Sequence, residues 1–99
     1  MRYSFLVLKS FVDRETERAW AGIPSRRLPA AMQSVARRKL RMLNNAESLN
    51  DLRIPPANRL EALKRERKGQ HSICINDQWR LCFRWMGNDA HDVENADYH

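Results

Sequence analysis

The sequence predicts an α+β fold, with two N-terminal helices packed on a mainly antiparallel sheet of about four strands. Three observations support this fold class. The chain has 99 residues, enough for one small domain that we expect to span residues 1–99. Helix signals dominate its first half. After residue 70 the apolar residues instead recur with a period of two, which is typical of half-buried antiparallel strands.

Charge narrows the expected partners. Lys and Arg total 18 against 12 Asp and Glu, a formal net charge of +6, which favours nucleic acid or an anionic membrane. A membrane is the weaker alternative, because the longest apolar run, residues 5–8, is far too short to cross a bilayer. We see no secretory signal, so we expect a cytoplasmic protein. So short a chain has no room for separate cofactor and substrate domains, and we expect no cofactor.

The first half of the chain should hold a strand and two helices. Residues 2–8 read as a first strand. Asp13 is a plausible N-cap for a helix that runs to about Trp20 and stops at Gly22. Pro29 should lie in the first turn of a second helix that continues to about Asn44. Its apolar face is marked by Leu28, Met32, Val35, Leu40 and Leu43. The Arg and Lys residues at 37–39 and 41 form either a solvated face or an RNA-binding surface.

A hairpin follows the loop-rich region around Pro55. Residues 76–78 supply its loop, and the alternation of Trp79, Leu81, Phe83 and Trp85 marks the core face. Pairing Ile75 with Trp79 sets Cys74 opposite Arg80 and Ser72 opposite Cys82. The two thiols are then diagonal neighbours, which argues against a disulfide. Arg80, Arg84, Ser72 and Cys74 should share the face opposite the core. A turn at 87–89 leads to a polar last strand, residues 90–98.

The C-terminal forty residues resemble the HigB branch of the RelE-type toxins. The similarity lies in residues 58–64, 69–73 and 76–83 and in the ending Asp97-Tyr98-His99. Its most specific pieces are the basic turn after Leu63-Lys64, the Trp79-Arg80 pair and that ending. The resemblance implies a RelE-like fold, ribosome-dependent cleavage of mRNA in the A site, and a helix-turn-helix antitoxin of the HigA type that masks the toxin.

The chain departs from the family pattern in three places, the basic turn and two single residues. The family turn is usually Lys-Gly-Asp-Arg, whereas Arg65 stands here in place of the Gly. If that Gly serves a left-handed backbone conformation, Arg65 would resist it and the turn would rearrange. Glu61 replaces a His found in some members. Asn95 replaces an aliphatic residue of the last strand, so that we expect looser packing there.

RNA cleavage through its own 2′-hydroxyl needs a base, an acid and cations that stabilise the phosphorane, but no metal. Arg80 is the best phosphate stabiliser, because its planar guanidinium matches phosphate oxygens. Asp97 and His99 are candidates for the acid–base pair, with Tyr98 stacking or donating a proton. Lys64 is a second candidate base. The candidate RNA-binding residues are Arg65, Arg67, Lys68 and Arg84.

Each of these residues also has a plain structural interpretation. Arg80 would be an ordinary exposed strand arginine, the basic turn would be a solvated loop, and Asp97-Tyr98-His99 would be a frayed terminus. A metal site of His71, His91 and His99 is disfavoured, because the spacing fits no ligand motif. The three Trp residues are expected in the core. The main alternative function is a non-catalytic RNA- or ribosome-binding module. A DNA-binding regulator is disfavoured, since no helix-turn-helix pattern is present.

Overall fold

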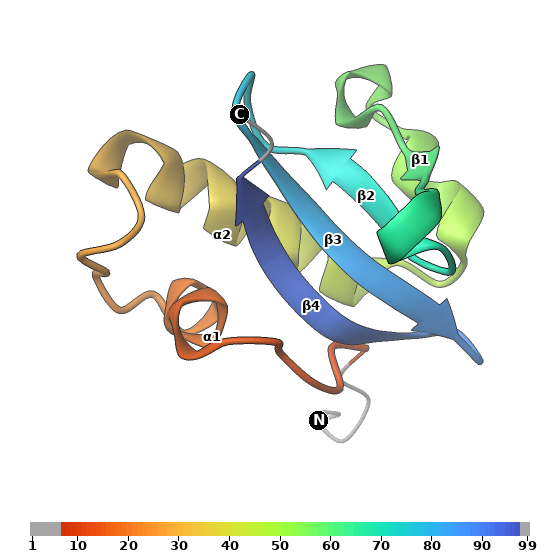
Figure 1. Ribbon diagram of the computed structural model, residues 1–99, viewed down its shortest axis with the longest axis horizontal. Helices are drawn as coiled ribbons and strands as arrows, with labels where there is room; N and C mark the ends of the chain where they lie inside the picture. The colour runs from red at the N-terminus through yellow and green to blue at the C-terminus, as the bar shows by residue number, and fades with distance from the viewer. Residues whose placement is uncertain (1–6, 98–99) are drawn as a thin grey trace.

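The computed structural model describes residues 7–97, and Figure 1 shows α2 crossing behind a twisted sheet whose β4 edge lies beside α1. The sheet has four antiparallel strands in the order β1-β2-β3-β4. This arrangement confirms the predicted fold class. The predicted first strand lies mostly outside the described residues, as do Tyr98 and His99. The elements are α1 (Arg14–Ala21), α2 (Ala30–Asn45), the 3-10 helices η2 (Leu49–Arg53), η3 (Pro56–Asn58) and η4 (Arg65–Arg67), and the strands β1 (Glu61–Ala62), β2 (His71–Cys74), β3 (Trp79–Met86) and β4 (Asp89–Asp97).

Local sequence signals fix the limits of α1. Asp13 Oδ1 accepts a hydrogen bond of 2.7 Å from the backbone N–H of Thr16, so the predicted N-cap is confirmed. Gly22 ends the helix in the left-handed conformation, at φ 78°, where its N–H donates to the carbonyl of Ala19. In α2, Pro29 is the N-cap rather than a residue of the first turn, because its ψ of 137° is extended.

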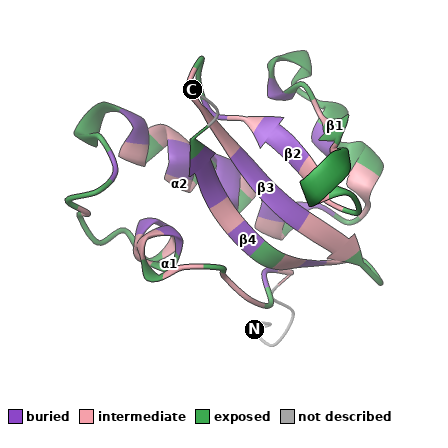
Figure 2. Cartoon of the chain, in the orientation of Figure 1, coloured by how far each residue is buried: buried purple, intermediate pink, exposed green. Residues whose placement is uncertain are grey.

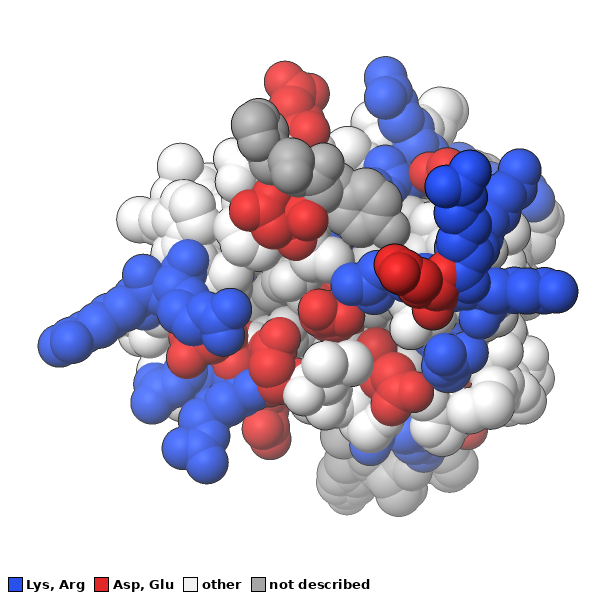
Figure 3. Space-filling model, viewed as in Figure 1, with Lys and Arg blue, Asp and Glu red and all other residues white. Residues whose placement is uncertain are grey.

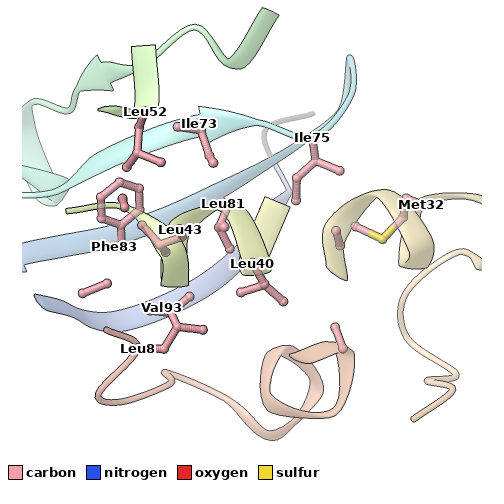
Figure 4. Close-up of a cluster of buried hydrophobic side chains, with 14 of the residues drawn as sticks. Leu8, Met32, Leu40, Leu43, Leu52, Ile73, Ile75, Leu81, Phe83 and Val93 are labelled. Atoms are coloured by element: carbon pink, nitrogen blue, oxygen red, sulfur yellow. The ribbon is translucent and has the colours of Figure 1, made fainter. Parts of the chain in front are cut away.

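One face of α2 supplies the centre of the core. Met32, Ala36, Leu40 and Leu43 are buried, and Figure 4 shows this part of the core beside side chains of the sheet such as Leu81 and Val93. Trp20, Trp79 and Trp85 pack against this core, as predicted. The buried Lys39 is the polar exception on this helix. Its Nζ donates to Asn58 Oδ1 at 2.6 Å and thereby joins α2 to η3.

The hairpin register is the predicted one. Cys74 lies opposite Arg80, Ile73 opposite Leu81, and Ser72 opposite Cys82. Asn76 Oδ1 closes the turn by accepting from the N–H groups of Gln78 and Trp79, at 2.9 and 2.8 Å. Within residues 7–97, neither Cys74 nor Cys82 forms a disulfide. Figure 2 shows that burial follows the middle of the sheet, whereas the turns and 3-10 helices are largely exposed.

A β-bulge in β4 changes which side chains face the helices. Arg84 pairs with His91 and Cys82 pairs with Glu94, so two residues of β4, Asp92 and Val93, face one residue of β3. Asp92 has a φ of 52° at this point. The extra residue reverses the alternation along the rest of β4. As a result Asn95 lies opposite Leu81 on the helix-covered face, where its N–H donates to Thr16 Oγ1 at 2.9 Å.

The other face of the sheet is called the outer face below. By strand pairing it carries Glu61, Ser72, Cys74, Arg80, Cys82, Arg84, His91, Glu94 and Ala96. The segment before α1 pairs in parallel with β4 through single bridges, Leu8 to Ala90 and Phe11 to Val93. Among residues 7–97, no helix has the length and apolar character needed to cross a membrane.

Candidate nucleic-acid interface

Arg80 is held rigidly on the outer face. Its Nε donates to Ser72 Oγ at 2.7 Å, across the hairpin, and its Nη2 donates to the carbonyl of Arg59 at 2.8 Å. Glu61 Oε1 lies 3.4 Å from the same Nη2. The Arg80 side chain is 13% exposed, against 60% for Glu61. The hairpin, β1 and the loop before β1 therefore fix the orientation of this guanidinium before any ligand arrives.

A hollow of about 480 Å³ opens beside Arg80. Its lining carries two cations and two carboxylates, and it consists of Ala57, Arg59, Glu61, Cys74, Asn76, Asp77 and Arg80. Arg59 enters this wall because it ends η3 in the left-handed conformation, at φ 48°. The hollow is thus polar and mixed in charge. It can hold an anionic group against Arg80 where that group also avoids Glu61 and Asp77.

The basic turn is a single turn of 3-10 helix at the end of β1. Lys64 is its N-cap residue, and Lys64, Arg65 and Lys68 are exposed. Arg65 has a φ of 57°, the left-handed conformation anticipated at the position where the family usually has Gly. The expected rearrangement of the turn is therefore not observed, because Arg65 itself adopts the left-handed conformation. The backbone strain of this region falls on a non-Gly residue.

Carboxylates accompany the remaining candidate cations of the outer face. Arg67 Nη1 lies 3.1 Å from Glu94 Oε1 and also donates to Gln70 Oε1 at 3.0 Å. Arg84 Nε lies 3.4 Å from Asp92 Oδ2. Gly69 leaves room for Arg84, since a Cβ there would lie 2.8 Å from Nη1. In Figure 3, acidic side chains (red) lie between two groups of basic side chains (blue). One basic group surrounds β1 and η4, and the other covers α1 and its connection to α2.

Asp97 ends the described part of β4 and lies away from Arg80. It pairs with Trp79, whereas Arg80 pairs with Ala96, so alternation places Asp97 and Arg80 on opposite faces. Gln78 Nε2 donates to Asp97 Oδ2 at 3.1 Å. The structure brings Arg80 and Arg59 together and joins Arg67 to β4. Lys64 lies at the start of the basic turn, outside the lining of the Arg80 hollow.

His71 and His91 lie on different faces of the sheet. His71 pairs with Phe83 and stacks on its ring, with 6.4 Å between centroids, on the helix-covered side. His91 pairs with Arg84 on the outer face. Burial, and secondarily the charge of Arg53, lowers the pKa of His71 from its ordinary 6.5. Within the described chain, no three His, Cys, Asp or Glu side chains are placed to hold a metal ion.

Sequence reasoning missed the partners that orient Arg80 from outside the hairpin. Arg59 and Glu61 precede it by 21 and 19 residues, as the numbering shows, and no local pattern links them to β3. The contact between Arg80 and Ser72 could have been predicted, because the predicted register already put both residues on one face. Arg59 acts through its carbonyl, which every residue has, so no residue-type signal exists for it.

Comparisons with known proteins agree with this arrangement. Residues 9–99 match the family model described as RelE-like toxin of type II toxin-antitoxin system HigB. The chain is 44% identical over 65 residues to toxin HigB-1 of Vibrio cholerae, covering 66% of this chain and 68% of that protein. It is 37% identical over 67 residues to an uncharacterised protein of Haemophilus influenzae, covering 68% of this chain and 66% of that protein.

The fold has a solved counterpart. A chain of the YoeB-YefM complex from Staphylococcus aureus superimposes with a TM-score of 0.59 at 17% identity, covering 93% of this chain and 97% of that one. At this identity the likeness concerns the fold alone. Together with the family match, it leads to one conclusion: the chain belongs to the HigB family of RelE-like toxins of type II toxin–antitoxin systems.

Proposed function

We propose that this toxin is a ribosome-dependent endoribonuclease that cleaves translated mRNA. The observation that carries the proposal is the fixed guanidinium of Arg80 at the wall of an open polar hollow. A cation that is oriented before the substrate binds stabilises the developing phosphorane without reorganisation cost. The hydrogen bonds from Arg80 to Ser72 and Arg59 supply that orientation.

In the proposed reaction the substrate provides the nucleophile. A base removes the proton of the 2′-hydroxyl, the 2′-oxygen attacks phosphorus, and the P–O5′ bond breaks. An acid protonates the leaving 5′-oxygen, so the products are a 2′,3′-cyclic phosphate and a 5′-hydroxyl. We assign phosphorane stabilisation to Arg80 and proton transfer to Lys64, Tyr98 and His99. Asp97, expected to share this step, lies on the opposite face of the sheet from Arg80 and is not assigned to it. Neither the residues nor the substrate require a metal in this scheme.

The basic turn supplies the proposed contacts with the RNA backbone. Arg65 and Lys68 are exposed and reach phosphates directly, whereas Arg67 and Arg84 are paired with Glu94 and Asp92. A phosphate that binds Arg67 or Arg84 must therefore compete with a carboxylate. The RNA path that costs least runs along η4 and the Arg80 hollow, away from the acidic strand β4.

Two macromolecular partners follow from the proposed role. A domain this small offers little surface to orient an mRNA, and the ribosomal A site would supply that positioning. We also propose a cognate antitoxin, of the helix-turn-helix HigA type, that masks the toxin. The similar Staphylococcus structure is a complex of YoeB with YefM, two different proteins bound to each other, which supports the idea of a masking partner.

Induced expression tests the activity. We would express wild type, Arg80→Ala, His99→Ala and the surface control Arg14→Ala, and map mRNA 5′ ends in the same cultures. Growth arrest with new in-frame cuts in wild type and Arg14→Ala, absent from the other two variants, would support the ribonuclease. Folded wild-type protein that creates no new ends would refute it.

A non-catalytic RNA- or ribosome-binding module is the second candidate. Two observations favour it: Glu61 stands beside Arg80 at 3.4 Å and Arg65 holds a left-handed backbone at φ 57°. A carboxylate there reduces the positive potential that a phosphate meets. This candidate predicts that wild type binds ribosomes and slows growth without creating new mRNA ends.

A further inference from the structure

Lys39 is a buried lysine of α2 that the proposed reaction does not use. It is 7% exposed, and its Nζ donates to Asn58 Oδ1 at 2.6 Å. This hydrogen-bond partner is a neutral amide rather than a carboxylate. Burial, and secondarily the charge of Arg38, lowers the pKa of Lys39 from its ordinary 10.5. Lysine side chains are rarely buried without an opposite charge, so the position of this ammonium calls for an explanation.

Asn58 is the last residue of η3 and ties that helix to its neighbours. It is fully buried. Its Oδ1 accepts from Lys39, and its Nδ2 donates to the carbonyls of Leu52, at 3.1 Å, and Ile54, at 3.5 Å. Its backbone N–H donates to the carbonyl of Pro55 at 2.9 Å. Both ends of the side-chain amide are therefore engaged, and the end of η3 is fixed relative to α2 and η2.

The next residue, Arg59, holds the guanidinium of Arg80. Arg59 ends η3 at φ 48° and ψ 56°, and its carbonyl accepts from Arg80 Nη2 at 2.8 Å. A left-handed backbone is unfavourable for a residue other than Gly and persists only where the surroundings fix it. The hydrogen bonds of Asn58, one residue earlier, supply such a constraint. They thereby set the direction of the Arg59 carbonyl.

We propose that Lys39 is a positioning residue for Arg80. It acts through Asn58 and the carbonyl of Arg59, and the inference rests on the proposed function, in which Arg80 stabilises the phosphorane. Without the ammonium, Asn58 Oδ1 is left buried and without its donor, which is costly. The amide then shifts to find another donor, and the backbone of Arg59 loses its constraint. The bond from Arg80 to Ser72 remains, so the guanidinium keeps its place but rotates more freely.

Rotation of the Arg80 guanidinium tests the proposal without RNA. NMR exchange measurements on the whole chain, labelled with ¹³C and ¹⁵N, give the rate of rotation about the Nε–Cζ bond. Lys39→Met removes the ammonium and keeps an unbranched apolar side chain. We expect rotation at least about fivefold faster than in wild type, because the bond from Nη2 to the Arg59 carbonyl is weakened. Lys9→Met, the same change on an exposed lysine, should match wild type.

RNA cleavage and RNA binding supply a second comparison. Cleavage of mRNA on ribosomes by Lys39→Met should be at least about fivefold slower than by wild type. Its dissociation constant for single-stranded RNA should stay within about twofold of the Lys9→Met value, because both variants lose one charge. Val93→Ala removes buried apolar volume from β4 and should lower the urea midpoint without changing rotation or cleavage. A loss of stability alone therefore does not reproduce the expected result.

Three outcomes are decisive. An unchanged rotation rate in Lys39→Met would overturn the proposal even if cleavage fell, because the lysine would then act by another route. Equally fast rotation in Val93→Ala would overturn it too, since lost stability would explain the effect. If Lys39→Met does not fold, Lys39→Gln, which is uncharged and one bond shorter, is compared by the same criteria. Wild type that cleaves no RNA refutes the ribonuclease, whereas the rotation rates still decide whether Lys39 positions Arg80.

Discussion

Arg67 of the basic turn is joined to Glu94 of the last strand, with 3.1 Å between Nη1 and Oε1. The two residues are 27 positions apart, and their ion pair links η4 to β4 across the outer face. One cation expected to bind RNA is thus held in place by a carboxylate. The same relationship recurs between Arg80 and Glu61 and between Arg84 and Asp92. A phosphate that binds one of these three arginines must therefore replace or displace the carboxylate beside it.

Glu94→Gln should raise the affinity for single-stranded RNA. The change keeps the shape of the side chain but removes the charge that competes with phosphate for Arg67. We expect binding a few-fold tighter, with the slope of log K against log salt steeper by up to about 0.7. Because both side chains are partly exposed, stability should change by less than about 1 kcal/mol. Fluorescence anisotropy at several salt concentrations measures both effects. Glu17→Gln on α1 is the control, and an unchanged affinity for Glu94→Gln would argue against the exchange.

Ser72→Ala should disturb Arg80 without touching the candidate site directly. Ser72 is fully buried and accepts from Arg80 Nε at 2.7 Å. Loss of this charge-assisted bond should cost about 1.5–3 kcal/mol of stability. If the bond orients Arg80, RNA cleavage should fall at least about tenfold while RNA binding stays nearly constant. Cleavage equal to that of the exposed control Ser34→Ala would show that Arg80 needs no such support.

Arg65 allows backbone strain to be separated from charge. At its φ of 57°, Arg65→Gly should stabilise the protein by about 1 kcal/mol, because an L-residue is disfavoured in this region. Arg65→Ala removes the same charge but keeps the strain. We therefore expect both variants to bind RNA more weakly and only the Gly variant to unfold at higher denaturant. Urea titrations measure this difference, and equal midpoints would mean that the turn carries no strain.

His71 should make stability depend on pH. Burial, helped by Arg53, lowers its pKa in the folded state below the ordinary 6.5, so the folded protein favours the neutral ring. The contribution to stability is present above about 6.5, the unfolded value, and is lost as pH falls toward the lower folded pKa. Urea midpoints between pH 8 and 5 should fall more for wild type than for His71→Leu. Parallel curves for wild type and His71→Leu would contradict the assignment.

Elements whose causes are local could be predicted from the order of the amino acids. Asp13 and Gly22 set the limits of α1 because capping acts within one turn, and alternation with a period of two was enough to pair Cys74 with Arg80. The expectation that Arg65 would resist a left-handed conformation was wrong, because Arg65 adopts a φ of 57° where the family uses Gly. Tyr98 and His99 fall outside the described residues, and their roles stay predictions.

Which distant groups meet depends on how the elements pack against one another. No residue near Arg80 in the sequence indicates that it contacts the carbonyl of Arg59 or the carboxylate of Glu61. These contacts depend on how η3 and β1 pack against the hairpin. The bulge at Asp92 likewise decides which face of the sheet the last residues of β4 occupy. A regular β4 starting from His91 would put Asp97 on the outer face, but one extra residue sends it and Asn95 to the helix side. Alternation is a local rule, and a single irregular residue reverses it for the rest of the strand.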